Sequence, residues 1–381
     1  MAQKCKPKAP DFILLFSTIV LLAIGLVMVL SASSLFSFRE FNNSYYLFYK
    51  QLQWAFLGIV LAFIVMFIPY KYWKKLSGLC VIFSLILLLL VQYTDLGVTI
   101  KGSTRWVQIA GISFQPSEIA KFSLVLFFAY MLSRYPVKGL KDAVIPVFVM
   151  CVFAALIYKQ PDLGTTVLIL VGCSAMLFIT ELSVLYFIAA VPICGLIGYN
   201  LIKDTPYQWN RILGWLYPWD YASSYGYQSV NAQIAFGTGG LLGIGIGRSS
   251  MNSHLPESYA DTIFAVIGEE FGFFGTSLVV LLFVLLISRG YVVSKQCGDR
   301  FGYMLGFGIT TFLALQIALN LGVVTGLLPV TGITLPLISY GGTSLVITLV
   351  QIGILLNISR YRQDKSYAEA EIIIIDDNDK G

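Results

Sequence analysis

The sequence predicts an all-α polytopic membrane protein with about ten transmembrane helices. Its 381 residues are 57% hydrophobic and only 12% charged, whereas soluble domains carry about twice that share of charge. Apolar runs recur along the chain, and a helix needs about 20 residues to cross the hydrocarbon core. Helices are expected because backbone polar groups in lipid must be hydrogen-bonded within the segment.

The expected spans are 11–33, 51–70, 75–94, 115–133, 142–158, 163–181, 184–202, 262–288, 302–327 and 334–358. The first follows three lysines, but its apolar stretch of about 19 residues is too long for the h-region of a secretory signal, so it is expected to remain as a span. Residues 1–10 and 361–381 are expected to be tails. Between them, residues 11–360 form one membrane domain, in which residues 203–261 are the largest loop.

Basic residues orient these spans. An even number of spans places both termini on one side, and roughly two-thirds of the 25 lysines and arginines fall on that side. They include clusters at 71–75, 134–141 and 289–300, which separate the second and third, fourth and fifth, and eighth and ninth spans. The termini are therefore predicted to be cytoplasmic. The net charge of +5 reflects this topology and does not indicate binding to nucleic acid.

Polar stretches gather on the predicted outer face, at 95–114, 158–166, 203–261 and 328–344. Neither a P-loop nor a dinucleotide fingerprint is present, so no organic cofactor is expected. The glycine-rich run 237–247 is expected to permit close backbone approach or a re-entrant turn. Six cysteines occur singly, without a CxxC or Cys/His cluster, which argues against a disulfide framework or a zinc site.

Three carboxylates lie in or beside the apolar run 262–268. Asp261 lies where an outer loop meets a long apolar helix, and by local chemistry alone an acid that caps the helix or lies in its first turn explains it better than a functional acid does. Glu269 and Glu270 lie roughly 12–13 Å deeper, at 1.5 Å per residue. A charge at that depth is costly, so we expect these two residues to be functional or to pair with a buried cation.

Three cations are candidates for binding an anion. Arg105 precedes a tryptophan, which fits either an interfacial anchor or a bidentate clamp for a diphosphate. Glu118 and Lys121 are i,i+3 neighbours at a helix start, where they either neutralise each other or leave Lys121 to serve a phosphate or a buried acid. Arg211 in the 203–261 loop is a further candidate.

Five long motifs occur in one order: "GSTRWVQIAGISFQPSEIAKF", "KQPDLGTT", "GYQSVNAQIAFGTGGLLGIGIG", "LPESYADTIFAVIGEEFGFFG" and "LPVTGITLPLISYGGTS". Together they resemble the SEDS proteins (shape, elongation, division and sporulation), the FtsW/RodA family, over about residues 11–360. Two further stretches, "NNSYYLFYKQLQWAFLG" and "RILGWLYPWDYASSYGYQ", look more like the FtsW/SpoVE branch than the RodA branch.

That resemblance implies a ten-span enzyme of the bacterial inner membrane that polymerises lipid II into peptidoglycan glycan strands. It also implies a partner, a class B penicillin-binding protein that acts as a transpeptidase, within a division or sporulation complex. One alternative is a flippase or transporter for the same lipid, which buried charges and broken helices would serve equally well. Another is a non-enzymatic scaffold of the cell-wall machinery.

The family's essential acid aligns with Asp261, which is therefore the expected general base. The same motifs supply substrate-binding candidates besides Arg105, Glu118, Lys121 and Arg211, namely Gln228, Glu257, Ser339, Gly341 and Gly342. Two departures from the family pattern occur: Tyr259-Ala260 stand where His-Thr is usual, and Tyr217 stands where an Asp usually precedes Pro-Trp. A divalent cation, Mg²⁺ or Mn²⁺, would suit an acid and a diphosphate, although no ligand motif is visible.

Overall fold

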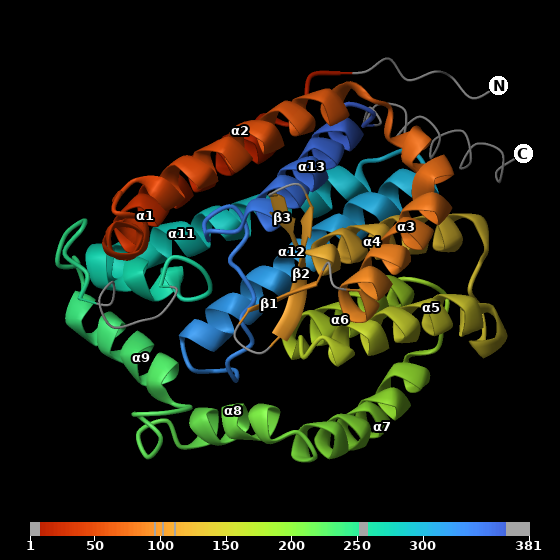
Figure 1. Cartoon of the computed structure of the whole chain (residues 1–381). Coiled ribbons are helices and arrows are strands. Elements are labelled where there is room, and N and C mark those ends of the chain that lie inside the picture. Colours follow the sequence, from red (N-terminus) through yellow and green to blue (C-terminus); the bar gives the residue numbers. More distant parts are fainter. Residues whose placement is uncertain (1–7, 95–96, 101–102, 110–111, 251–257, 363–381) are drawn as a thin grey trace, which may run out of the picture.

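The computed structural model describes residues 8–94, 97–100, 103–109, 112–250 and 258–362, and helices dominate this part of the chain (Figure 1). Each predicted span corresponds to a long helix. In chain order they are α1 (Phe12–Phe41), α2 (Tyr46–Phe67), α3 (Trp73–Tyr93), α4 (Pro116–Arg134), α5 (Leu140–Lys159), α6 (Leu163–Phe178), α7 (Val184–Lys203), α11 (Ile263–Lys295), α12 (Arg300–Val324) and α13 (Gly342–Ser359).

Among the described residues, eight of these helices are long and apolar enough to cross a membrane. The other two, α6 and α4, do not meet these requirements of length and apolar composition, each for a different reason. Helix α6 is apolar but only 16 residues long. Helix α4 buries Glu118 and Lys121 within its first two turns. Helix α4 therefore differs from a typical span because it carries a buried charged pair.

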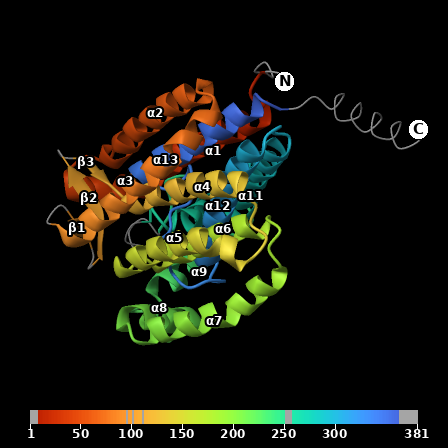
Figure 2. The same cartoon turned by 90° about the vertical axis from the view of Figure 1, so that its right-hand side faces the viewer.

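The centre of the molecule consists of α4, α12 and α13, which bury most of their residues. Helix α7 is the opposite case, since none of its residues is buried. Figures 1 and 2 place α7 and the short helix α8 (Pro206–Leu216) at the edge of the molecule. Helix α7 therefore contributes no buried polar side chain to the interior of the described structure.

One predicted helix start is wrong. The last span was expected to begin at residue 334, but α13 begins at Gly342, and residues 329–335 have neither helix nor strand structure. We call residues 328–341 the α12–α13 segment; Figure 1 shows it running from α12 back to α13. Leu335 and Ile338 of this segment are buried, so it lies inside the protein. Apolar composition alone cannot distinguish such a buried extended segment from a helix.

Short elements connect the spans. A 3₁₀ turn, η1 (Tyr70–Tyr72), precedes α3. Strands β1 (Gly97–Ile100), β2 (Ser103–Ile109) and β3 (Ile112–Phe114) form an antiparallel sheet in the order β1-β2-β3, within the predicted outer stretch 95–114.

Helix α7 ends at Lys203 and α11 begins at Ile263, which agrees with the predicted 203–261 loop. That loop contains α8 and α9 (Tyr227–Gly239).

Helix α11 is broken at Gly272, whose φ of 65° lies in the left-handed region. The glycine-rich stretch after α9 packs beside this break. Its Gly240 carbonyl accepts the Phe273 amide at 2.9 Å. A Cβ on Gly239 would lie 1.9 Å from the Gly268 carbonyl oxygen, so only glycine fits there. The predicted close backbone approach is confirmed.

The two ends of the described chain are hydrogen-bonded to each other. The Lys8 amide donates to the Arg360 carbonyl at 2.8 Å. Asp11 caps α1 by accepting from the Leu14 amide and forms an ion pair with Arg289 of α11. These contacts tie α1, α11 and the end of α13 to one another.

Candidate active site

Asp261 lies immediately before α11, where three separate parts of the chain approach it. The Gln228 side chain of α9 donates from Nε2 to Asp261 Oδ2 at 3.2 Å. The Asn320 side chain of α12 donates from Nδ2 to the Asp261 backbone carbonyl at 2.8 Å. A Cβ on Gly332 would lie 3.9 Å from Oδ2, so the α12–α13 segment passes beside the carboxylate. The structure thus brings Asp261 and Gln228 together.

The alternative explanation of Asp261 as a capping or first-turn acid is wrong. The N-cap of α11 is Thr262, and the first turn of this helix contains no acidic residue. Asp261 is half-buried rather than fully exposed. Its carboxylate is therefore oriented by a side chain from another helix and not by the start of its own helix.

Lys121 and Glu118 form a buried ion pair on α4, with Nζ and Oε1 2.9 Å apart. Lys121 also donates to Gln316 Oε1 of α12 at 2.7 Å. Gln316 in turn donates from Nε2 to the Thr334 carbonyl of the α12–α13 segment at 3.1 Å. Mutual neutralisation, one of the two expectations for this pair, is confirmed. The pair is also linked to the segment that passes Asp261.

Arg105 extends from β2 to the turn between α5 and α6. Its Nε donates to the Gln160 carbonyl at 3.0 Å, a terminal nitrogen donates to the Pro161 carbonyl, and the other lies 3.9 Å from Asp162 Oδ1. Asp162 caps α6 through the Thr165 amide. In this arrangement the guanidinium group fastens the sheet to the α5–α6 turn, and its charge is partly matched by Asp162.

Arg211 lies on α8 and stacks over the Tyr207 ring, with its guanidinium carbon 4.6 Å from the ring centre. One terminal nitrogen donates to the Val330 carbonyl at 3.1 Å. Trp215 on the same helix donates to the Gly326 carbonyl at 2.9 Å. Helix α8 therefore contacts the chain at and just before the start of the α12–α13 segment, and it brings a positive charge there.

Ser339, Gly341 and Gly342 are held by α2. Gln51 donates from Nε2 to the Ser339 carbonyl at 3.1 Å and accepts from the Gly341 amide at 3.3 Å. A Cβ on Gly342 would lie 2.5 Å from the Trp54 ring. These contacts fix the start of α13, and in the described part of the chain none of them joins the three residues to Asp261.

Sequence reasoning missed Gln51, Gln316 and Asn320. Each is a buried amide side chain inside an apolar helix. A polar residue inside a span usually faces other parts of the protein and has a partner there. Gln316 and Asn320 are moreover four residues apart, so they share one helix face. That signal was present in the sequence "LALQIALNLG".

Glu269 and Glu270 fasten the glycine-rich stretch to α11. Glu269 accepts from Ser250 Oγ at 2.7 Å, and Glu270 accepts from Ser31 Oγ at 2.6 Å and from the Gly247 amide at 3.1 Å. The expectation of pairing with a buried cation is wrong for Glu270, which forms no ion pair with a described lysine or arginine. Hydroxyl and amide donors stabilise this carboxylate in place of a cation.

Glu257 lies outside the described residues. Within them, no group of three or more His, Cys, Asp or Glu side chains is placed to hold a metal ion. Asp261 and Gln228 supply at most three side-chain oxygen ligands at one place, the two carboxylate oxygens and one amide oxygen. This donor set fits a divalent cation only where a substrate phosphate provides further ligands, which is how Mg²⁺ commonly binds.

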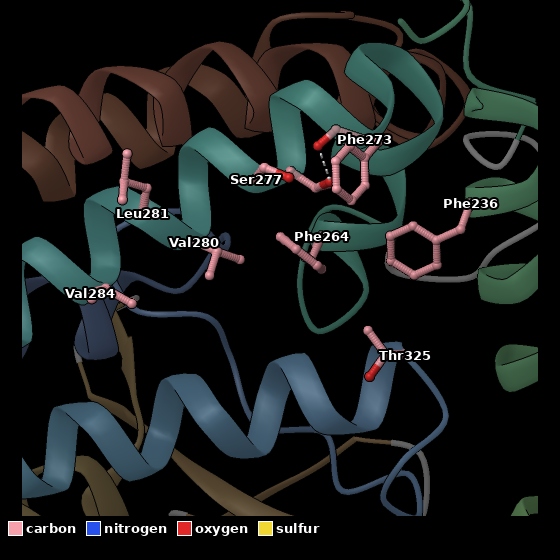
Figure 3. Close-up of a pocket in the computed structure, with 9 residues that line it drawn as sticks. Phe236, Phe264, Phe273, Ser277, Val280, Leu281, Val284 and Thr325 are labelled. Atoms are coloured by element: carbon pink, nitrogen blue, oxygen red, sulfur yellow. Dashed lines mark hydrogen bonds between the residues drawn. The ribbon is translucent and has the colours of Figure 1, made fainter. Parts of the chain in front are cut away.

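A groove of about 490 Å³ lies along α11 between α9 and α12, as Figure 3 shows. Its lining is apolar apart from hydroxyl groups and includes Phe236, Phe264, Phe273 and Thr325. Phe264 follows Asp261 by three residues, so the groove begins close to the candidate base. None of the lining residues is titratable, so the groove itself contributes no acid or base.

Comparison with known proteins identifies the family of this chain. Residues 12–364 match the model of the family FTSW_RODA_SPOVE, described as cell cycle protein. Stage V sporulation protein E of Bacillus subtilis (strain 168) is 37% identical over 361 residues, which cover 93% of this chain and 98% of that protein. A Geobacter metallireducens protein named probable peptidoglycan glycosyltransferase FtsW is 37% identical over 353 residues, with coverage of 92% and 94%.

The fold has a solved counterpart as well. A chain in the structure described as "Structural coordination of polymerization and crosslinking by a peptidoglycan synthase complex" superimposes with a TM-score of 0.79 at 30% identity, covering 93% of this chain and 99% of that one. The two curated relatives carry the names of the FtsW/SpoVE branch that the motifs indicated. The helices, the motifs and the matches agree: this chain is a multi-pass membrane protein that belongs to the FtsW/RodA/SpoVE family.

Proposed function

We propose that this protein is a peptidoglycan glycosyltransferase that polymerises lipid II into glycan strands at the outer face of the bacterial inner membrane. The observation that carries the proposal is the convergence of one carboxylate, Asp261, and one buried cation, Lys121, on the α12–α13 segment. The names of the curated relatives support it. An acid and a cation linked to one segment match the needs of glycosyl transfer from a diphosphate, which are a base for the acceptor hydroxyl and a positive charge for the leaving group.

In the proposed reaction, a sugar hydroxyl of the acceptor attacks the anomeric carbon of the lipid-linked donor. A glycosidic C–O bond forms, the bond from the anomeric carbon to the diphosphate oxygen breaks, and the lipid diphosphate leaves with the electron pair. Asp261 takes the hydroxyl proton as general base, while Gln228 orients the carboxylate through Oδ2. One carboxylate suffices because diphosphate is already a good leaving group, unlike the alkoxide that a glycosidase must protonate.

Lys121 is proposed to bind the departing diphosphate. An ammonium group has three N–H donors, and Glu118 and Gln316 accept two of them. The third can donate to a phosphate oxygen. Arg211 supplies a second positive charge beside the same segment. Mg²⁺ or Mn²⁺ carried by the diphosphate is a proposed cofactor that would neutralise charge on the leaving group.

The proposed orientation places both termini in the cytoplasm and the 203–261 loop outside, as the distribution of basic residues indicates. The proposed partner is a class B penicillin-binding protein that cross-links the new strands, in a division or sporulation complex. The structural similarity to a chain of a peptidoglycan synthase complex supports a partner of this kind.

Purified protein incubated with lipid II tests the function directly. We expect glycan chains on a gel with the wild-type protein. Asp261→Asn is nearly isosteric, so it should fold and bind lipid II, yet polymerise roughly 10²–10⁴-fold more slowly because it cannot accept the proton. Lipid II that moves across a vesicle bilayer without forming chains would instead identify a flippase. Binding with neither activity would identify a scaffold.

A further inference from the structure

Two amide side chains stand one turn apart on α12, in the middle of the protein. Gln316 and Asn320 are 5% and 1% exposed. A four-residue spacing places both on one helix face. The neighbouring positions of the helix, from Leu315 to Leu319, are otherwise apolar. Two amides inside such a helix carry a desolvation cost that their hydrogen bonds must offset.

Asn320 joins the chain around Asp261 to the α12–α13 segment. Its Nδ2 donates to the Asp261 carbonyl at 2.8 Å and to the Ile333 carbonyl at 2.7 Å. Both partners are acceptors, which fixes the orientation of the amide, since only its nitrogen can donate. One planar group thus sets the distance between the backbone of the proposed base and Ile333.

Gln316 makes the corresponding link to the proposed diphosphate cation. Its Nε2 donates to the Thr334 carbonyl at 3.1 Å, and its Oε1 accepts from Lys121 at 2.7 Å. The carbonyls that Asn320 and Gln316 bind, those of Ile333 and Thr334, are consecutive. Asp261 and Lys121 therefore lie at two ends of one hydrogen-bonded path.

We propose that Gln316 and Asn320 are positioning residues, which set Asp261 and Lys121 at the separation that glycosyl transfer from a lipid diphosphate requires. This inference rests on the proposed function. Asn320 acts on the base, so its loss slows the chemical step. Gln316 acts on the diphosphate cation, so its loss weakens substrate binding. Neither side chain needs to touch the substrate.

Asn357 of α13 provides a matched control. It is also 1% exposed, donates from Nδ2 to the Met66 carbonyl at 2.7 Å and accepts from the Tyr70 amide at 2.8 Å. Like Asn320, it joins two backbone groups from inside an apolar helix. Its partners lie at the end of α2 and at the start of η1, and not in the α12–α13 segment.

The test compares Asn320→Leu, Gln316→Met and Asn357→Leu in lipid II polymerisation, with thermal stability in detergent measured for each. We expect Asn320→Leu to lower kcat by roughly tenfold to a hundredfold with KM within about twofold of wild type, since a misplaced base slows chemistry without weakening binding. Gln316→Met should raise KM more than it lowers kcat. Asn357→Leu should lose stability but keep kcat per folded molecule. Asn320→Ser repeats the test if the leucine variant fails to fold.

Two results would overturn the inference and leave the function standing: wild-type kcat in both Asn320 variants, or an equal loss of kcat in Asn357→Leu, which would reduce the effect to general destabilisation. Failure of the proposed function is separate. It would appear as wild-type polymerisation by Asp261→Asn, whatever the Asn320 variants do.

Discussion

Gln228 Nε2 lies 3.2 Å from Asp261 Oδ2, so a side chain of α9 orients the carboxylate that precedes α11. The two residues are 33 positions apart in the chain. This contact connects α9 with the proposed general base, and it can be removed without changing any charge.

Gln228→Leu should therefore lower kcat by roughly tenfold while the protein folds normally, because a general base depends on its orientation toward the proton. Steady-state polymerisation of lipid II measures this. Gln233 on the same helix is the control, since its amide lies beside Gly326 rather than Asp261. Equal activity in Gln228→Leu and Gln233→Leu would show that the contact has no catalytic value.

The ion pair of Lys121 and Glu118 predicts a rescue of folding without a rescue of activity. Lys121→Met leaves Glu118 as an unpaired buried charge, which costs about 3–5 kcal/mol of folding free energy. The double variant Lys121→Met/Glu118→Gln removes both charges and should recover the yield and melting temperature. It should still polymerise poorly, because the proposed diphosphate cation is gone. Full activity in the double variant would exclude Lys121 from substrate binding.

The hydrogen bonds of Arg105 allow two interpretations of this residue to be tested against each other. Arg105→Lys keeps the positive charge but loses the planar fork that donates from two separate nitrogens to the carbonyls of Gln160 and Pro161. If the residue holds the α5–α6 turn, both Arg105→Lys and Arg105→Ala should lower stability by about 1–3 kcal/mol. If it binds the diphosphate as a charge, only the alanine variant should raise KM. Thermal melting and lipid II kinetics on the same samples decide between these outcomes.

We expect substitution of Glu270 to lower the stability of the protein rather than its catalytic rate. Glu270→Leu removes the acceptor of both the Ser31 hydroxyl and the Gly247 amide, and each buried donor left unsatisfied costs about 1–3 kcal/mol. The folded yield should fall, while kcat per folded molecule should stay near wild type. Normal folding with lost polymerisation would mean that Glu270, and not Asp261, is the essential carboxylate.

The proposed orientation can be measured at Ser224, which is exposed in the loop between α8 and α9. Its replacement by cysteine in a background without reactive native cysteines should allow labelling by an impermeant thiol reagent on intact spheroplasts. Labelling only after lysis would place this loop in the cytoplasm. The substrate, presented at the outer face, could not then reach Asp261.

Local composition was sufficient to predict the ten long helices, the boundaries of the 203–261 loop and the position of Asp261 at the edge of α11. A run of about 20 apolar residues forms a span in lipid whatever its neighbours are, because backbone hydrogen bonds must be made within the segment. The five motifs likewise identified the family without any knowledge of the fold. These properties depend on residues close together in the chain.

The tertiary structure alone decided which polar groups meet. Lys121 and Gln316 are 195 positions apart, and Arg105 and Gln160 are 55 apart. A buried polar group must find a partner, but helix packing determines which one, and no local pattern encodes that packing. Helix packing likewise explains why Glu270 is stabilised by a serine from α1 instead of a cation. It also explains why α13 begins at Gly342 rather than at residue 334.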